Sequence, residues 1–159
     1  MRSTFTDWYN KKMYANQEIT DETHYIGQLL DQVKVIAIVG ISAKPTRDSY
    51  FVGSYLQKAG YTVIPVNPTA EEILGVPCYP DLKSIPVAVD VVNVFRKPQD
   101  VPDLIIQALE IKATHIWLQL GVGTHREQEI KAKKAGSTLI QNRCIKVDHQ
   151  FLIRPNSNN

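Results

Sequence analysis

A polar loop with a single glycine follows the first apolar run of the chain, and its residue types suit phosphate binding. The run Val35–Val39 ends at Gly40, and Ser42, Lys44 and Arg47 come within the next seven residues. A glycine lets the backbone approach a diphosphate closely, and the free N–H groups at the start of a following helix favour negative charge. Hydroxyl and cationic side chains add donors for the same anion. The loop therefore predicts a diphosphate site.

This loop departs from the familiar fingerprints for nucleotide binding. Ser42 and Pro45 stand where G-x-G-x-x-G has its second and third glycines, and no G-x-x-x-x-G-K-[ST] run is present. The second apolar run ends in Val66-Asn67-Pro68, where NAD enzymes usually carry an acid for the ribose hydroxyls. Without that acid, and with cations in the first loop, the site suits a ribose that bears an extra phosphate, as in NADP or coenzyme A. A plain turn explains Asn67-Pro68 equally well.

Polar and cationic residues also follow the later apolar runs. Arg96 and Lys97 follow the third run, residues 119–123 (QLGVG) follow the fourth, and residues 142–144 (NRC) follow the fifth. A single lysine or arginine is usually a solvated surface residue. Because cations recur at three strand ends, we expect them to border one binding site.

Short apolar runs alternate with amphipathic segments from Val33 onward, and this alternation predicts βαβ units. The expected strands span residues 35–39, 61–66, 87–95, 115–119 and 138–141. The expected helices span residues 49–59, the segment that follows the N-cap Asp100, and residues 124–135. A short helical turn is expected within residues 68–86. We therefore expect an α/β fold with a doubly wound, five-stranded parallel sheet, Rossmann-like and of order 3-2-1-4-5. Ligands of such sheets bind at the carboxyl ends of the strands, where the strand order reverses.

The chain length predicts a single domain preceded by an extension. At 159 residues and 43% hydrophobic composition the chain can bury one sizeable core. Residues 1–32 are expected to form an N-terminal helical extension, since apolar side chains from Tyr25 to Leu30 recur at helical spacing. Residues 33–159 are expected to form the nucleotide-binding domain.

Composition excludes several classes of protein. A net charge of +2 argues against a nucleic-acid partner, and no apolar run approaches the roughly 20 residues that span a bilayer. The start of the chain has no signal-peptide pattern, so we expect a cytoplasmic protein with no membrane partner. Cys78 and Cys144 are far apart in sequence, which favours reduced thiols over a disulfide framework.

Five stretches carry a specific resemblance: GISAKPTRDSYFVGSYLQKAGYTVIPVNP, EEILGVPCYPDL, VDVVNVFR, WLQLGV and NRCIKVDH. They resemble, in the same order, the small stand-alone CoA-binding domain proteins, which are similar to the N-terminal CoA-binding domain of the succinyl-CoA synthetase alpha subunit. The resemblance covers roughly residues 33–149 and implies coenzyme A as the ligand. The synthetase loop is richer in glycine than GISAKPTR.

The resemblance also implies which residues surround each part of coenzyme A. The residues implied for the diphosphate are Gly40 and Ser42, with Lys44 and Arg47 nearby. The residues implied for the adenine and ribose are Val66, Asn67 and Pro68, with Phe95 and Arg96 bordering the cofactor. The residues implied for the pantetheine arm are Leu120, Gly121 and Asn142.

No catalytic residue and no metal site are predicted. The four histidines are dispersed, and the synthetase takes its phosphorylated histidine from a further domain. Cys144 has Arg143 and Lys146 beside it, which could favour a thiolate that forms a mixed disulfide with coenzyme A, although buried cysteine is the commoner case. No general base for that thiol is evident.

The sequence thus predicts non-catalytic binding of coenzyme A or an acyl-CoA, as a sensor or as a module that serves a partner. Two alternatives stay open: an NADP-dependent oxidoreductase, and a structural module that has lost its ligand. The acylation state of the ligand, a protein partner and a homo-oligomer stay open as well.

Overall fold

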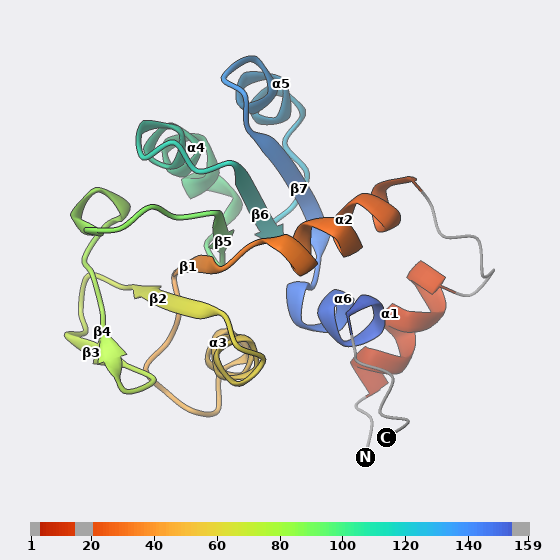
Figure 1. The fold of residues 1–159 in the computed structure, drawn as a ribbon, viewed down its shortest axis with the longest axis horizontal. Coiled ribbons are helices and arrows are strands. Elements are labelled where there is room, and N and C mark those ends of the chain that lie inside the picture. Colours follow the sequence, from red (N-terminus) through yellow and green to blue (C-terminus); the bar gives the residue numbers. More distant parts are fainter. Residues whose placement is uncertain (1–3, 15–20, 154–159) are drawn as a thin grey trace. The chain divides into compact units, whose positions relative to one another are not determined.

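The computed structural model describes residues 4–14 and 21–153, which fall into two compact units. Residues 33–143 form the sheet unit (Figure 1). The described residues up to Gln32 and those from Cys144 onward form the helical unit.

Five parallel strands make up the sheet of the sheet unit. They are β1 (Val35–Val39), β2 (Thr62–Val66), β5 (Val91–Val94), β6 (His115–Gln119) and β7 (Thr138–Arg143). The helices between them are α3 (Asp48–Lys58), α4 (Val101–Glu110) and α5 (Arg126–Lys134). This architecture confirms the expected doubly wound, Rossmann-like α/β fold.

The segment between β2 and β5 has no α-helix. It holds a small hairpin of β3 (Glu72–Ile73) and β4 (Val76–Pro77), followed by the 3₁₀ turn η1 (Leu82–Ser84). The expected short helical turn is therefore present, whereas the hairpin was not predicted. A second 3₁₀ turn, η2 (Pro98–Asp100), leads into α4.

The strand order corrects one part of the prediction. The order is β2-β1-β5-β6-β7, which is 2-1-3-4-5 when the five strands are counted along the chain, and not 3-2-1-4-5. The third strand, β5, pairs with β1 instead of lying outside β2. The reversal of strand order, where ligands bind in such sheets, therefore lies between β1 and β5.

Pro65 gives the physical reason for this order. Its carbonyl faces the outer edge of β2 and accepts the N–H of Tyr79 at 3.0 Å. The N–H and C=O of one residue in a strand point to the same edge, so the donor that Pro65 lacks is missing from that outer edge. Among the described residues, the outer side of β2 forms one isolated bridge, between Val66 and Tyr79. Strand three therefore pairs on the free side of β1.

Side chains of the sheet alternate between two covered faces. Ala37 and Val39 of β1 lie in one hydrophobic core with residues of η1, α4 and α5. Ile38 points to the opposite face, where its side chain lies against Gly53 of α3. Figure 1 shows α4 and α5 on one side of the sheet and α3 on the other. All five residues of β1 can therefore be apolar, as the run VIAIV is.

Asp90 joins the beginnings of three strands. Its Oδ2 accepts the backbone N–H groups of Lys34 and Val35, each at 2.9 Å, and its own carbonyl accepts the N–H of His115 at 3.1 Å. The carboxylate thereby satisfies two donors that precede the ladder of β1.

We expect Asp90→Ala to lower the free energy of unfolding by about 2–3 kcal/mol, because the variant loses two charge-assisted hydrogen bonds to backbone donors. Urea denaturation followed by circular dichroism measures this change. Glu110→Ala, at the exposed end of α4, is the control and should change stability by less than about 0.5 kcal/mol. An equal effect of the two variants would contradict this role for Asp90.

The helical unit consists of α1 (Thr4–Tyr14), α2 (Asp21–Gln32) and α6 (Ile145–Leu152). Tyr9 is fully buried, and its hydroxyl donates to Oδ1 of Asp148 and accepts the N–H of Cys144. Ile26 and Leu29 are buried as their spacing predicted.

Helix α6 was not predicted. The expected domain of residues 33–159 included it, but in the structure it packs with α1 and α2. None of the described helices is long and apolar enough to cross a membrane.

Candidate functional site

The carboxyl ends of β1 and β5 meet where the strand order reverses. Gly40 follows β1 with a φ of +86°, and its N–H donates to the carbonyl of Val66 at 3.0 Å. The N–H of Phe95 donates to the carbonyl of Val39 at 2.8 Å. A Cβ at Gly40 would collide with the carbonyl oxygen of Phe95. The glycine is therefore required by the close approach of two backbone segments.

The loop after Gly40 is held by hydroxyl groups. The Oγ of Ser49 accepts the N–H of Ser42 at 2.9 Å, and the Oγ of Ser42 accepts the N–H of Lys44 at 3.1 Å. The Ser42 hydroxyl thus shapes the loop. Lys44 and Arg47 are exposed at its surface.

Asn67 connects the loops that follow β1 and β2. Its Nδ2 donates to the carbonyl of Ile41 at 2.8 Å, and its Oδ1 accepts both the N–H and the hydroxyl of Thr69, each at 2.8 Å. Both ends of this amide are therefore engaged within the chain. These bonds give Asn67 a structural role between the two loops.

A cleft of about 300 Å³ opens beside these loops, between α4 and η1. Its apolar surface comes from Val39, Val66, Leu82 and Leu104 together with Pro68 and Pro80. Its polar rim comes from Asp81, Arg96, Gln99, Asp100, Asp103 and Gln107. The cleft thus combines an apolar floor with a polar edge, as ligand sites usually do.

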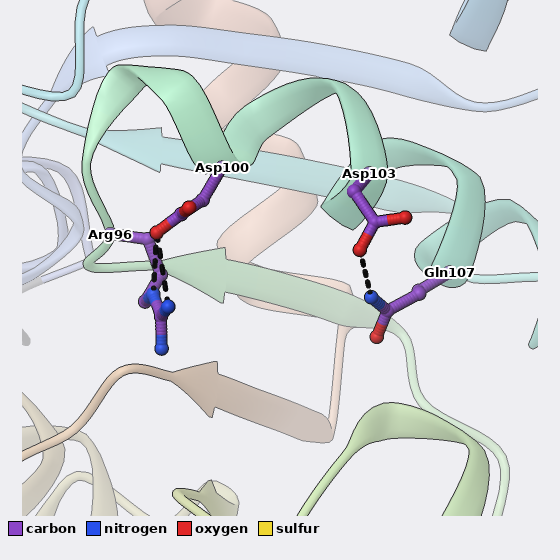
Figure 2. Close-up of polar contacts among 4 residues, drawn as sticks. All are labelled: Arg96, Asp100, Asp103 and Gln107. Atoms are coloured by element: carbon purple, nitrogen blue, oxygen red, sulfur yellow. Dashed lines mark hydrogen bonds and ion pairs between the residues drawn. The ribbon is translucent and has the colours of Figure 1, made fainter.

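Arg96 is the only cationic side chain among the residues that line this cleft, and it is paired. Its Nε and Nη2 both lie 3.0 Å from Oδ2 of Asp100, the residue four positions along the chain (Figure 2). The two side chains are 42% and 37% exposed, so the pair is partly solvated. Asp100 was predicted to cap α4 and holds the cap position, but its side chain makes no capping bond.

A wider groove of about 710 Å³ lies on the other side of Arg96. Its apolar lining comes from Phe95, Pro98, Leu120 and Val122, with Gly121 beside them. Arg96 and Asp100 line the groove as well as the cleft. The ion pair therefore stands where the two hollows meet.

The structure brings half of the predicted site residues into these hollows. Those that line the cleft or the groove are Val66, Pro68, Phe95, Arg96, Leu120 and Gly121. Those that line neither are Gly40, Ser42, Lys44, Arg47, Asn67 and Asn142. Asn142 is half-buried in β7 with a φ of +57°.

The residues on α4 and η1 that line the cleft were not predicted. Asp103 and Gln107 lie one turn apart on α4, and Nε2 of Gln107 donates to Oδ2 of Asp103 at 2.8 Å (Figure 2). Their spacing, like that of Arg96 and Asp100, is i, i+4, which is a readable signal for a side-chain pair. The predicted site residues lie only at strand ends and in the loops that follow them, so this pair on α4 was not among them.

The two cysteines and the histidines do not assemble into a reactive group in the part of the chain that the structure describes. Cys144 is 6% exposed at the start of α6, and burial raises the pKa of the Cys78 thiol. No three histidine, cysteine or acidic side chains among the described residues lie together as metal ligands would.

Stability should decrease in mild acid because two histidines, the buried His149 and the half-buried His115, bind a proton less readily in the folded chain. Burial lowers the pKa of His149, and burial likewise lowers that of His115, where Asp90 opposes it. The unfolded chain therefore binds protons more readily, so stability is full above about pH 6.5 and falls as the pH drops towards the folded-state pKa values. Urea denaturation at pH 7.5 and 5.5 measures this loss, and His149→Gln should reduce it. The exposed His24→Gln is the control, and an equal effect would contradict the role of burial.

Comparison with known proteins agrees with this geometry. The model of the CoA binding domain family matches residues 34–150, which include the sheet and both hollows. This chain belongs to the CoA-binding domain family. This chain is 42% identical over 124 residues to YneT of Bacillus subtilis (strain 168), an uncharacterised protein. The matched residues are 78% of this chain and 91% of YneT.

A second relative of this chain is a much larger enzyme. An ADP-forming acetate–CoA ligase of Archaeoglobus fulgidus is 36% identical over 69 residues, which are 43% of this chain and 10% of the ligase. The similarity therefore concerns one small part of that enzyme.

Two solved structures share the fold over most of this chain. A hypothetical protein from Pyrococcus horikoshii OT3 is 38% identical with a TM-score of 0.78, covering 87% of this chain and 95% of its own. A protein from Thermus thermophilus is 34% identical with a TM-score of 0.77, covering 82% and 98% respectively.

Proposed function

We propose that this chain binds coenzyme A or an acyl-CoA across the cleft and the groove, and that it does not itself transform the ligand. One observation carries the proposal: in a member of the CoA-binding domain family, Arg96 lines two adjoining hollows at the β1/β5 reversal. A nucleotide that carries a pantetheine arm needs one site for the nucleoside and an adjoining site for the arm, with a cation near the diphosphate that joins them.

The cleft suits the adenosine part of the ligand. Its floor is apolar and lies beside Pro68, and its volume of about 300 Å³ can take a nucleoside but leaves little room for the arm. The rim carries three carboxylates, so a 3'-phosphate would be repelled inside the cleft. We therefore place that phosphate outside it, towards the exposed Lys44 and Arg47.

The groove suits the pantetheine arm and an attached acyl group. Phe95, Leu120 and Val122 offer apolar contacts, and Gly121 has no side chain to obstruct an extended chain. Burial of methylene groups against such a surface is favourable by about 0.8 kcal/mol per group. An acyl-CoA would gain from the same surface.

The absence of turnover is also part of the proposal. Cys144 is buried and its backbone N–H is bonded to Tyr9, which supports a structural role. None of the residues that line the cleft or the groove is a histidine or a cysteine. A binding protein of this kind would sense coenzyme A or present it to a partner.

Calorimetric titration with CoA, acetyl-CoA, NADP and NAD tests the binding. CoA and acetyl-CoA should bind more tightly than both dinucleotides, and added salt should weaken the binding because the phosphate contacts are partly exposed. Equal affinity for CoA and NAD would overturn the assignment. Tighter binding of NADP would favour the oxidoreductase alternative.

A turnover assay tests the non-catalytic part. The protein is incubated with acetyl-CoA or succinyl-CoA, with and without ATP and Mg²⁺, and free thiol is followed over hours. We expect no protein-dependent release. Release that disappears in Cys144→Ser would identify that thiol as a nucleophile and refute the non-catalytic role.

A further inference from the structure

The hydrogen bond between Gln107 and Asp103 fixes the direction of the Gln107 amide. An ionised carboxylate only accepts hydrogen bonds, so the NH₂ group of Gln107 must face Asp103, as its Nε2 does at 2.8 Å. The reverse orientation would place two oxygens against each other. The carbonyl oxygen of Gln107 therefore points away from Asp103, and both side chains line the cleft (Figure 2).

The remaining rim of the cleft also offers mainly acceptors. Asp81 accepts the N–H and the hydroxyl of Ser84, and these bonds lower the pKa of its carboxyl, which keeps it ionised at neutral pH. Asp100 accepts from two of the five N–H donors of the Arg96 guanidinium, the one cation in the lining. A ligand that enters the cleft therefore meets carboxylate and amide oxygens that can accept a hydrogen bond, beside the amide of Gln99 and the remaining donors of Arg96.

The floor of the cleft restricts the shape of that ligand. Val39, Val66, Leu82 and Leu104 form an apolar surface beneath the rim. A planar ring can lie on this surface with its polar edge directed at α4. A ring edge that carries an amino group supplies donors for the oxygens of the rim.

We propose that the cleft selects a nucleobase with an exocyclic amino group, adenine, and that Gln107 is the residue that determines this specificity. The carbonyl oxygen of Gln107 accepts from the amino group, and Asp103 is the positioning residue that holds the amide in this direction. The inference rests on the proposed binding of coenzyme A and adds how its base is recognised.

The experiment compares CoA with its hypoxanthine analogue, in which an oxygen replaces the amino group. Wild-type protein should bind CoA about tenfold more tightly, since the analogue sets a carbonyl against the Gln107 oxygen where adenine sets an amino donor. Calorimetry gives both affinities. Gln107→Leu, a variant of similar size, should reduce the ratio to about one.

Asp103→Asn provides a second variant that does not shorten any side chain. An asparagine can donate as well as accept, so the Gln107 amide can turn over and present its NH₂ group to the cleft. The preference for CoA should then fall or reverse. Ile106→Ala, an exposed residue of the same helix outside the cleft lining, is the control and should keep the wild-type ratio.

The outcomes separate this inference from the proposed function. If wild-type protein binds CoA and the analogue equally, the role of Gln107 is refuted while CoA binding stands. If the wild-type ratio persists in both Gln107→Leu and Asp103→Asn, adenine is recognised elsewhere and the inference is also refuted. If neither ligand binds the wild-type protein, the proposed function fails together with the inference.

Discussion

Gly40→Ala should lower the free energy of unfolding of the sheet unit by about 3–5 kcal/mol, one of the largest effects expected of any single substitution in this chain. The added Cβ would collide with the carbonyl oxygen of Phe95 and lie 2.9 Å from Cδ of Arg96. The carbonyl belongs to the backbone after β5, so relief of the collision must separate the ends of two paired strands. Urea denaturation measures the loss of stability.

Gly136→Ala separates this collision from simple backbone strain. Gly136 has a φ of +82°, close to the +86° of Gly40, but a Cβ there would meet nothing within 4 Å. We expect it to lower stability by only about 1–2 kcal/mol, the usual effect of placing a side chain at positive φ. Equal destabilisation by the two substitutions would show that positive φ alone explains the need for glycine at position 40. Any loss of CoA binding in a Gly40 variant must therefore be interpreted together with its stability.

Arg96→Gln should weaken the binding of CoA by about 10- to 100-fold. Arg96 lines both the cleft and the groove, so it is placed to contact the diphosphate that joins the two parts of the ligand. Hydrogen bonds to a charged group contribute about 1.5–3 kcal/mol, which corresponds to this range of affinity. Calorimetry at low and high salt measures the effect, and the variant should show a weaker salt dependence than the wild-type protein.

Asp100→Asn should act in the opposite direction. Asp100 competes with the ligand for the Arg96 guanidinium, and a partly exposed pair of this kind is worth at most about 1 kcal/mol. Its removal should therefore tighten CoA binding up to about fivefold. Lys97→Gln, which removes a neighbouring cation that lines only the groove, should have a smaller effect than Arg96→Gln. If Arg96→Gln binds CoA as the wild-type protein does, the diphosphate lies elsewhere, with Lys44 and Arg47 as the next candidates.

Local patterns in the sequence were sufficient to identify the five strands of the parallel sheet and the helices α3, α4 and α5. The residues of β1 and β6 were predicted with the bounds that the structure shows, because a continuous apolar run between polar loops is typical of a strand buried on both faces. The third strand, Val91–Val94, is shorter than the expected span of residues 87–95. The hairpin of β3 and β4 was missed because two-residue strands are too short to show the alternation of apolar and polar residues that predicts a strand.

The order of the strands depends on contacts between segments far apart in the sequence. Hydrophobic periodicity reports which face of an element is buried but not which neighbour covers it. Pro65 carried relevant information, because a strand that lacks a donor on one edge is suited to the edge of a sheet. The missing donor of Pro65 can be read from the sequence, but the edge of β2 on which it falls is visible only in the structure.

Residue types alone determined that this chain has an α/β sheet, a glycine at the first strand end and cations suited to a phosphorylated ligand. They also carried the resemblance to the CoA-binding domain family. Only the tertiary structure decided that β5 lies beside β1, that Arg96 is held by Asp100 between two hollows, and that Gln107 and Asp103 of α4 line the cleft. The physical reason is that an apolar run or a turn is specified by neighbours in sequence, whereas a binding cleft is formed by side chains that only the packing of strands and helices brings together.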